Sequence, residues 1–336
     1  MRNLLIGLAL LLGVLFLLNH FTQFDAIVDV LQHSDWRFIG LALVFIAAWL
    51  LCTAATYQAV FAALGVERPV APLVPLAAAA NFVNVVAPSM GMSGMAVLIS
   101  DARRRRLPSA HATVAGALFV LFEYAGFALY LVLGLIVLFR RDDITGPELA
   151  ASGVLMVMTA ILLVILYLGM RAPKALGHFL RWIARTTNKL SSPFTKRKTI
   201  SEDRAEQFAH DIAAGLHSAR QPRKLLKPLF YALLSKGMLL CVLTAVFLAF
   251  QAPISIGTLI AGFAIAYLFL IVSPTPAGVG VVEGVLTLTL TSMFVPLEQA
   301  AVITLSYRVL TFWLPLLFGF LSFQFLQIRK PFPTSS

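Results

Sequence analysis

The sequence predicts an all-α, polytopic integral membrane protein, and three observations support this fold class. Of the 336 residues, 60% are hydrophobic and 12% are charged, whereas soluble globular domains are about 45–50% apolar and about 25% charged. Several apolar runs reach roughly 20 residues, the length of helix that crosses a bilayer. Half of the basic residues, 13 of 26, gather in one segment between these runs, 171–228. Lipid is therefore expected to surround most of the chain.

Six apolar runs are long enough to be spanning helices. In chain order they cover residues 3–18, 38–64, 109–139, 149–170, 229–250 and 297–328. Two more apolar stretches, 72–100 and 254–294, are interrupted in the middle by Pro and Gly, which disfavour a continuous helix. We expect both stretches to be hairpins, and the sequence leaves open whether they are re-entrant or cross the membrane and return.

The basic residues predict the orientation, because cytoplasmic loops carry an excess of Lys and Arg. The arginines 103–106, the segment 171–228 with 13 basic and four acidic residues, and the basic pair 329–330 are expected on the cytoplasmic side. Both termini of this plasma (inner) membrane protein would then be cytoplasmic. The basic segment is expected to meet anionic headgroups, either as amphipathic surface helices or as a solvated loop. Nucleic-acid binding is disfavoured for a basic segment beside apolar spans.

The two halves of the chain repeat the same order of elements. At an offset of 188 residues, Pro88 corresponds to Pro276 and Pro108 to Pro296. Each half contains a span, a broken hairpin and another span, in units 38–139 and 229–328. The loop charges give the two units opposite orientations, the inverted-repeat arrangement of many transporters, whose sites lie at the repeat interface. We therefore expect one transmembrane domain over residues 1–336, with its site between the units.

Four charged side chains fall inside apolar runs, where each costs a few kcal/mol unless it has a partner or a wet cavity. They are Glu123, Lys236, Glu283 and Arg308. Two interpretations remain open. Either the two carboxylates and two cations form buried pairs that hold helices together, or at least one of them contacts a substrate, with Arg308 suited to a phosphate and a glutamate to an amine.

The break in the second hairpin has the spacing of a nucleotide-binding loop, with Gly278, Gly280 and Gly284 after an apolar run. A dinucleotide site also needs a soluble strand and an acidic residue about 20 positions later, and the sequence has neither here. We expect instead that a helix restarts near Val279. Its first turn would offer backbone N–H groups and the positive end of a helix dipole to a lipid phosphate.

The break in the first hairpin, residues 88–95, offers similar chemistry. Ser89 and Ser93 are additional hydrogen-bond donors, and Asn81 and Asn84 precede them by one and two turns. The alternative is that the small residues only permit close helix packing. That alternative explains the glycines better than it explains the polar side chains, because unpaired polar groups in an apolar setting are costly.

No catalytic set is apparent. The six histidines are scattered without metal-ligand spacing, both cysteines lie in apolar runs, and the chain has no motif for ATP hydrolysis. We predict no cofactor, no metal and no enzymatic activity.

Two motifs near the C-terminus resemble a known family. Residues 276–283 read Pro-x-Gly-x-Gly-x-x-Glu and residues 307–315 read Tyr-Arg-x-x-x-x-Trp-x-Pro, similar to the C-terminal signature of the lysylphosphatidylglycerol synthase transmembrane-region family. Residues 81–112 resemble its first motif. The resemblance implies a flippase-like domain that moves aminoacylated phosphatidylglycerol between leaflets. It carries functional roles over to a set of five residues: Glu283, Tyr307, Arg308, Gly278 and Gly280.

The chain also departs from that family's pattern. Many relatives have Arg after the residue corresponding to Glu123 and a carboxylate soon afterwards, whereas this chain has Tyr124 and Phe127. Bifunctional relatives carry a soluble acyltransferase-like domain, but only nine residues follow Gln327 here. Lipid transport without lysyl transfer is the expected function, and oligomers are possible. The alternative is a non-transporting scaffold or accessory protein for envelope lipid or polysaccharide synthesis.

Overall fold

A computed structural model describes residues 34–86, 93–104, 109–141, 146–171, 175–179, 181–182, 185, 225–273 and 275–329. Within these ranges the regular structure is entirely helical, which confirms the all-α class. The expected span 3–18, most of the basic segment 171–228, and Pro88 and Ser89 of the first break lie outside the described residues.

The helices follow the expected order closely. They are α3 (Trp36–Ala63), α4 (Leu73–Val86), α5 (Ser93–Arg104), α6 (Ser109–Phe139), α7 (Gly146–Arg171), α10 (Leu226–Ala249), α11 (Ile256–Val272), η3 (Pro276–Gly278), α12 (Val281–Ser292), α13 (Leu297–Arg308), η4 (Val309–Trp313) and α14 (Leu314–Arg329).

Four helical stretches are long and apolar enough to cross a membrane. They are Trp36–Ala63, Thr113–Phe139, Leu226–Ala249 and Leu297–Leu326, and they coincide with four of the six expected spans. The expected span 149–170 lies in α7, a single helix of 26 residues. Large hydrophobic side chains are exposed along these helices, including Leu41, Leu51, Val132, Leu317 and Leu321. Such extensive apolar surface is typical of contact with lipid, so the chain is a membrane-embedded protein with several apolar helices.

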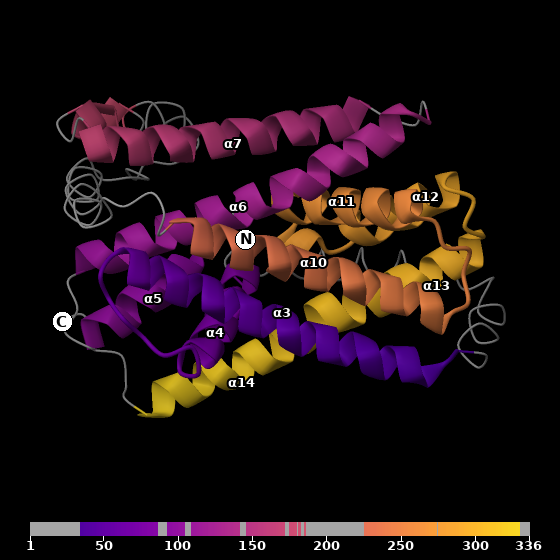
Figure 1. Cartoon of the computed structure of the whole chain (residues 1–336), viewed down its shortest axis with the longest axis horizontal. Helices are drawn as coiled ribbons and strands as arrows, with labels where there is room; N and C mark the ends of the chain where they lie inside the picture. The colour runs from indigo at the N-terminus through magenta and orange to yellow at the C-terminus, as the bar shows by residue number, and fades with distance from the viewer. Residues whose placement is uncertain are drawn as a thin grey trace, which may run out of the picture.

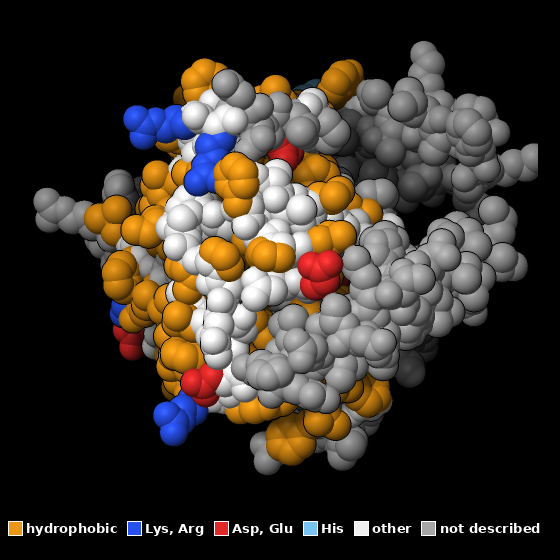
Figure 2. Space-filling view, turned by 90° about the vertical axis from the view of Figure 1, so that its right-hand side faces the viewer, with side chains coloured by type: hydrophobic (Ala, Val, Ile, Leu, Met, Phe, Trp, Pro, Cys, Tyr) orange, Lys and Arg blue, Asp and Glu red, His pale blue; other side chains and the backbone are white. Residues whose placement is uncertain are grey.

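The long helices lie along the longest axis of the molecule (Figure 1). The helix α10 packs along α3 and also contacts α6 and α11. At one end of the α3–α10 pair, the backbone N–H of Asp35 donates to the carbonyl of Ala249 at 2.8 Å. Figure 2 looks at the right-hand end of Figure 1, where hydrophobic side chains extend along the flank and few charged ones are visible.

Each of the two broken stretches forms two shorter helices that pack against each other, α4 with α5 and α11 with α12. The first pair lies toward the left of Figure 1 and the second toward the right. The turn η3, in the break between α11 and α12, contacts α4. The break of one pair therefore lies against a helix of the other pair.

The hydrogen-bonding pattern of the last span changes directly after Arg308. Its segment η4 is a π-helix, in which the N–H of Leu314 bonds to the carbonyl of Val309, five residues earlier. Pro315 has no N–H and its ring clashes with the carbonyl four residues before it, so a local widening of the helix relieves this conflict. Single π-turns of this kind are frequent at functional sites.

Candidate functional site

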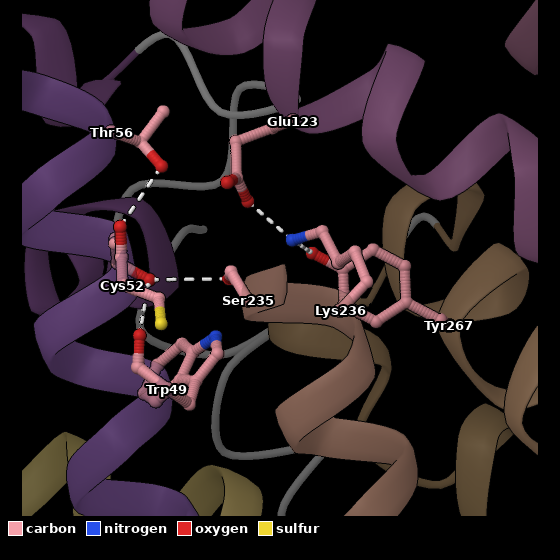
Figure 3. A network of polar contacts seen from close by, with 8 residues as sticks. Trp49, Cys52, Thr56, Glu123, Ser235, Lys236 and Tyr267 are labelled. Atoms are coloured by element: carbon pink, nitrogen blue, oxygen red, sulfur yellow. Dashed lines mark hydrogen bonds and ion pairs between the residues drawn. The ribbon is translucent and has the colours of Figure 1, made fainter. Parts of the chain in front are cut away.

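Lys236 is the centre of a polar cluster between α6, α10 and α11. Its side chain has no exposed surface. The ammonium group donates to Oε2 of Glu123 on α6 and, at 2.5 Å, to the hydroxyl of Tyr267 on α11. The ammonium nitrogen also lies 4.5 Å from the centre of the Tyr267 ring. Figure 3 shows Lys236 reaching between these two partners. We call these three residues the Lys236 cluster.

The two oxygens of the Glu123 carboxylate have different surroundings. Oε2 accepts from Lys236, whereas Oε1 is buried and, within the described residues, has no hydrogen-bond partner. The side chain as a whole keeps 16% of its surface exposed. The cluster is thus enclosed on the lysine side and less so on the glutamate side.

Packing of small residues brings Glu123 and Lys236 together. One turn after Glu123 is Gly126, where a Cβ atom would lie 2.9 Å from the backbone carbon of Ala232, one turn before Lys236. No real Cβ atom tolerates that distance, so a larger residue at 126 would push α6 away from α10. The neighbouring Ser235 points to the other side of α10, where its hydroxyl lies 3.4 Å from that of Thr53 on α3.

A second ion pair joins α12 and α13. The guanidinium of Arg308 donates from Nε to Oε1 of Glu283 at 2.7 Å, and from Nη2 to the carbonyl of Ala277 at 2.9 Å. Its central carbon lies 4.6 Å from the centre of the Phe312 ring. Arg308 is 4% exposed and the Glu283 side chain 17%. This arrangement ties the last spanning stretch to the turn η3.

Glu283 also caps its own helix. Its Oε2 accepts from the backbone N–H of Gly280, the residue before α12, at 2.7 Å. The helix begins at Val281, two residues later than the sequence suggests. The first donor expected to meet a lipid phosphate is therefore bonded to a carboxylate of the same chain. An incoming phosphate would have to displace Glu283 to reach it.

The glycines of this turn are needed for its backbone. Gly278 and Gly280 have φ values of +69° and +83°, a region that only glycine enters at little cost. At Gly278 a Cβ atom would additionally lie 3.4 Å from the Cα atom of Leu270 and meet the side chain of Val282, whereas at Gly280 the space is open. These two expected site residues shape the turn that presents the Ala277 carbonyl to Arg308.

The polar residues of the first break have a capping role in the structure. The side-chain oxygen of Asn84 accepts from the hydroxyl of Ser93 at 2.8 Å and from the backbone N–H of Gly94 at 2.6 Å. Both donors belong to the first turn of α5, so Asn84 satisfies the start of that helix. Asn81 is half-buried one turn earlier on α4.

A tyrosine accompanies each buried cation. The hydroxyl of Tyr267 accepts a hydrogen bond from Lys236, and Tyr307, the residue before Arg308, is buried. Sequence reasoning singled out Tyr307 but missed Tyr267, because it searched the apolar runs for charges. A phenol in the middle of the run 256–272 was the available signal.

The geometry thus brings the four intramembrane charges together as two neutral pairs. The profile of a protein family described as "Lysylphosphatidylglycerol synthase TM region" matches residues 4–319, most of the chain. No curated protein matches the chain. The chain belongs to the lysylphosphatidylglycerol synthase transmembrane-region family, which confirms the resemblance seen in its two C-terminal motifs.

Proposed function

We propose that this protein moves a phospholipid with a phosphatidylglycerol-like headgroup, aminoacylated or not, between the two leaflets of a membrane. The family indicates a membrane role in lipid handling. The observation that carries the proposal is the position of Arg308. This cation is buried inside an apolar span, beside a break in a neighbouring membrane-buried stretch. Intramembrane charges of this kind generally mark a pathway for a polar substrate.

The chemistry of the Arg308 surroundings suits a phosphate. A guanidinium binds phosphate oxygens through paired N–H donors. The backbone N–H of Gly280 donates to the same carboxylate, that of Glu283, as Arg308 does. A phosphate that replaces the Glu283 carboxylate would meet both donors. The released carboxylate would then be available to the amine of an aminoacylated headgroup.

We also propose how the chain is arranged in the membrane. Six spans and the two helix pairs α4–α5 and α11–α12 form two units of inverted orientation, with both termini in the cytoplasm of an inner-membrane protein. The opposite placement of the two pairs along the long axis, and the contact of η3 with α4, support this plan. The lipid headgroup would cross between the units, past Lys236 and Arg308. No chemical step on the lipid is assigned to this chain.

Reconstitution tests the proposal. Phosphatidylcholine liposomes carry one fluorescent lipid each: phosphatidylglycerol, lysyl-phosphatidylglycerol or a polyprenyl phosphate. A membrane-impermeant quencher measures the fraction in the outer leaflet over time. We expect the phosphatidylglycerol lipids to change leaflet faster than in protein-free liposomes, and Arg308→Gln to slow them. Equal rates with and without protein for all three lipids would refute transport.

The second candidate is a non-transporting scaffold for envelope lipid or polysaccharide synthesis. One observation favours it: each of the two cations, Lys236 and Arg308, is paired with a glutamate and almost completely buried. Under this alternative the charges only hold helices together. Liposomes with wild-type protein would then show no lipid movement, and replacing both members of the Glu123–Lys236 pair by neutral residues would leave complex formation with a partner enzyme unchanged.

A further inference from the structure

The Lys236 cluster has a carboxylate that is only half satisfied. Within the described residues, Oε1 of Glu123 has no hydrogen-bond partner, although it is buried. An ionised oxygen without a donor in such a place is unfavourable. Oε1 is the carboxylate oxygen left to accept a proton, and the Glu123 side chain as a whole keeps 16% of its surface exposed, although Oε1 itself is enclosed. The Glu283 carboxylate differs, because both of its oxygens accept hydrogen bonds.

The charge of the cluster depends on Glu123 and Lys236. Among the described residues, the other titratable groups around Glu123 are the phenols of Tyr267 on α11, Tyr57 on α3 and Tyr124 on α6 itself. Phenols are neutral near pH 7. On α5, which also packs against α6, Asp101 is bonded to Arg68 at 2.7 Å. The carboxylate and the ammonium therefore sum to zero.

Adding a proton to Glu123 disturbs this balance. The cluster would then carry one positive charge on a lysine that has no contact with solvent, and an uncompensated charge inside a membrane protein is strongly disfavoured. An anion at Lys236 restores neutrality. The phosphate of a lipid headgroup is the anion that the proposed function brings to this part of the protein.

We infer that Glu123 binds one proton for each anionic headgroup that Lys236 accepts, so that an anionic phospholipid and a proton cross the membrane together. This inference rests on the proposed function and adds its energy source. The proton enters from water on one side, adds to the Glu123 carboxylate and leaves to water on the other side. Lys236 remains an ammonium ion throughout and exchanges the Glu123 oxygen for a phosphate oxygen. One positive and one negative charge move together, so no net charge is transferred.

A pH gradient tests the coupling. Phosphatidylcholine liposomes with fluorescent phosphatidylglycerol receive a gradient of one pH unit, or a potassium-diffusion potential at equal pH. With wild-type protein we expect the label to accumulate about tenfold in the leaflet toward which protons flow, because one pH unit is a factor of ten in proton activity. The potential alone should have no effect. With Glu123→Gln, the gradient should no longer redistribute the label.

The matched control is Glu67→Gln, which removes a carboxylate from an exposed loop and should respond to the gradient as wild type does. A second measurement does not require transport. Dihexanoyl-phosphatidylglycerol is added to purified protein in weakly buffered detergent, and proton uptake is recorded. We expect about one proton per bound lipid for wild type and Glu67→Gln, and none for Glu123→Gln.

The outcomes separate the two proposals. If wild-type protein moves phosphatidylglycerol but neither responds to the gradient nor takes up protons on binding, the coupling is refuted and the transport function stands. If wild-type protein neither binds nor moves the lipid, both are refuted. The wild-type measurements decide the matter even if Glu123→Gln fails to fold.

Discussion

The two ion pairs of this protein have the same composition, a glutamate and a cation inside apolar helices, yet they are built differently. Glu123 and Lys236 are 113 residues apart and join helices from the two halves of the chain. Glu283 and Arg308 are 25 residues apart and join consecutive helices of the second half. The second pair uses both carboxylate oxygens and an additional backbone carbonyl, whereas in the first pair one oxygen has no donor among the residues that the structure describes.

The Glu283–Arg308 pair is therefore a brace within one half of the chain, whereas the Glu123–Lys236 pair links the two halves. The Glu283–Arg308 pair fixes a turn whose backbone is already constrained by glycines with positive φ. The Glu123–Lys236 pair has no such local support, because it exists only where α6, α10 and α11 meet. A pair that depends on packing between halves is the one that a relative movement of those halves would break.

The largest expected effect comes from removing the buried lysine. Lys236→Met leaves the Glu123 carboxylate without its cation, and breaking a buried pair by deleting one partner costs about 3–5 kcal/mol. We expect a loss of this size in the free energy of unfolding, measured by denaturant titration in detergent micelles. The double variant Glu123→Gln/Lys236→Met should recover most of it. Equal losses in the single and double variants would show that the charge pair is not the cause.

Arg308→Lys should have a smaller effect. The positive charge is kept, but a lysine lacks the planar fork that reaches Glu283 and the Ala277 carbonyl together. We expect a loss of about 1.5–3 kcal/mol, the value of a hydrogen bond to a charged group, in the same unfolding titration. Arg37→Lys, at the exposed start of α3, is the control and should be neutral. A neutral Arg308→Lys would mean that the brace depends on charge alone.

The glycines of this turn can be ranked by the stability that each loses on substitution by alanine. Gly278→Ala and Gly280→Ala both place a side chain at positive φ, which costs about 1–2 kcal/mol. Gly278→Ala should be the worse of the two, because its Cβ atom also meets Val282 and Leu270. Gly284→Ala, inside α12 with open space around it, should be neutral or slightly stabilising. Thermal unfolding of the three variants gives the order, and a reversed order of 278 and 280 would contradict the turn geometry.

The smallest loss of stability is expected for a change at Ser235, the residue directly before Lys236. Ser235→Ala removes the hydroxyl that lies 3.4 Å from that of Thr53, and hydrogen bonds between membrane helices contribute about 0.6 kcal/mol on average. We expect a change at or below that value in the unfolding titration. A loss comparable to that of Lys236→Met would mean that any change in this part of α10 disrupts the packing, and the special role of the lysine would have to be abandoned.

Much of the fold could be predicted from the sequence because hydropathy and helix breakers act locally. The limits of α3 and α10 lie within three residues of the expected spans, and the Pro–Gly breaks interrupt the helices where they should. The family was recognisable from the motifs around Glu283 and Arg308, and its profile confirms it. The six-span inverted plan, the orientation and the roles of the site residues remain predictions.

The partners within the site could not be predicted in the same way. The sequence offered two carboxylates and two cations without indicating which would pair. Nothing in the chain near Glu123 indicates Lys236, since the pairing depends on Gly126 allowing α6 to approach α10. Tyr267 was missed because a single phenol hardly changes the hydropathy of its run.

By itself, the sequence determined that this chain is embedded in a membrane. It also determined which residues form the helices and at which residues the helices break. These properties follow from the side chains of each segment and their transfer between water and lipid, which depends little on the rest of the chain. Only the tertiary structure decided that Glu283 occupies the donors expected for a phosphate, and that Lys236 is enclosed while one oxygen of Glu123 has no partner in the described part of the chain. The Lys236–Glu123 contact depends on the distance between helices far apart in the sequence, and packing alone sets such a distance. The Glu283 contacts depend on how the consecutive helices α12 and α13 pack around the turn η3.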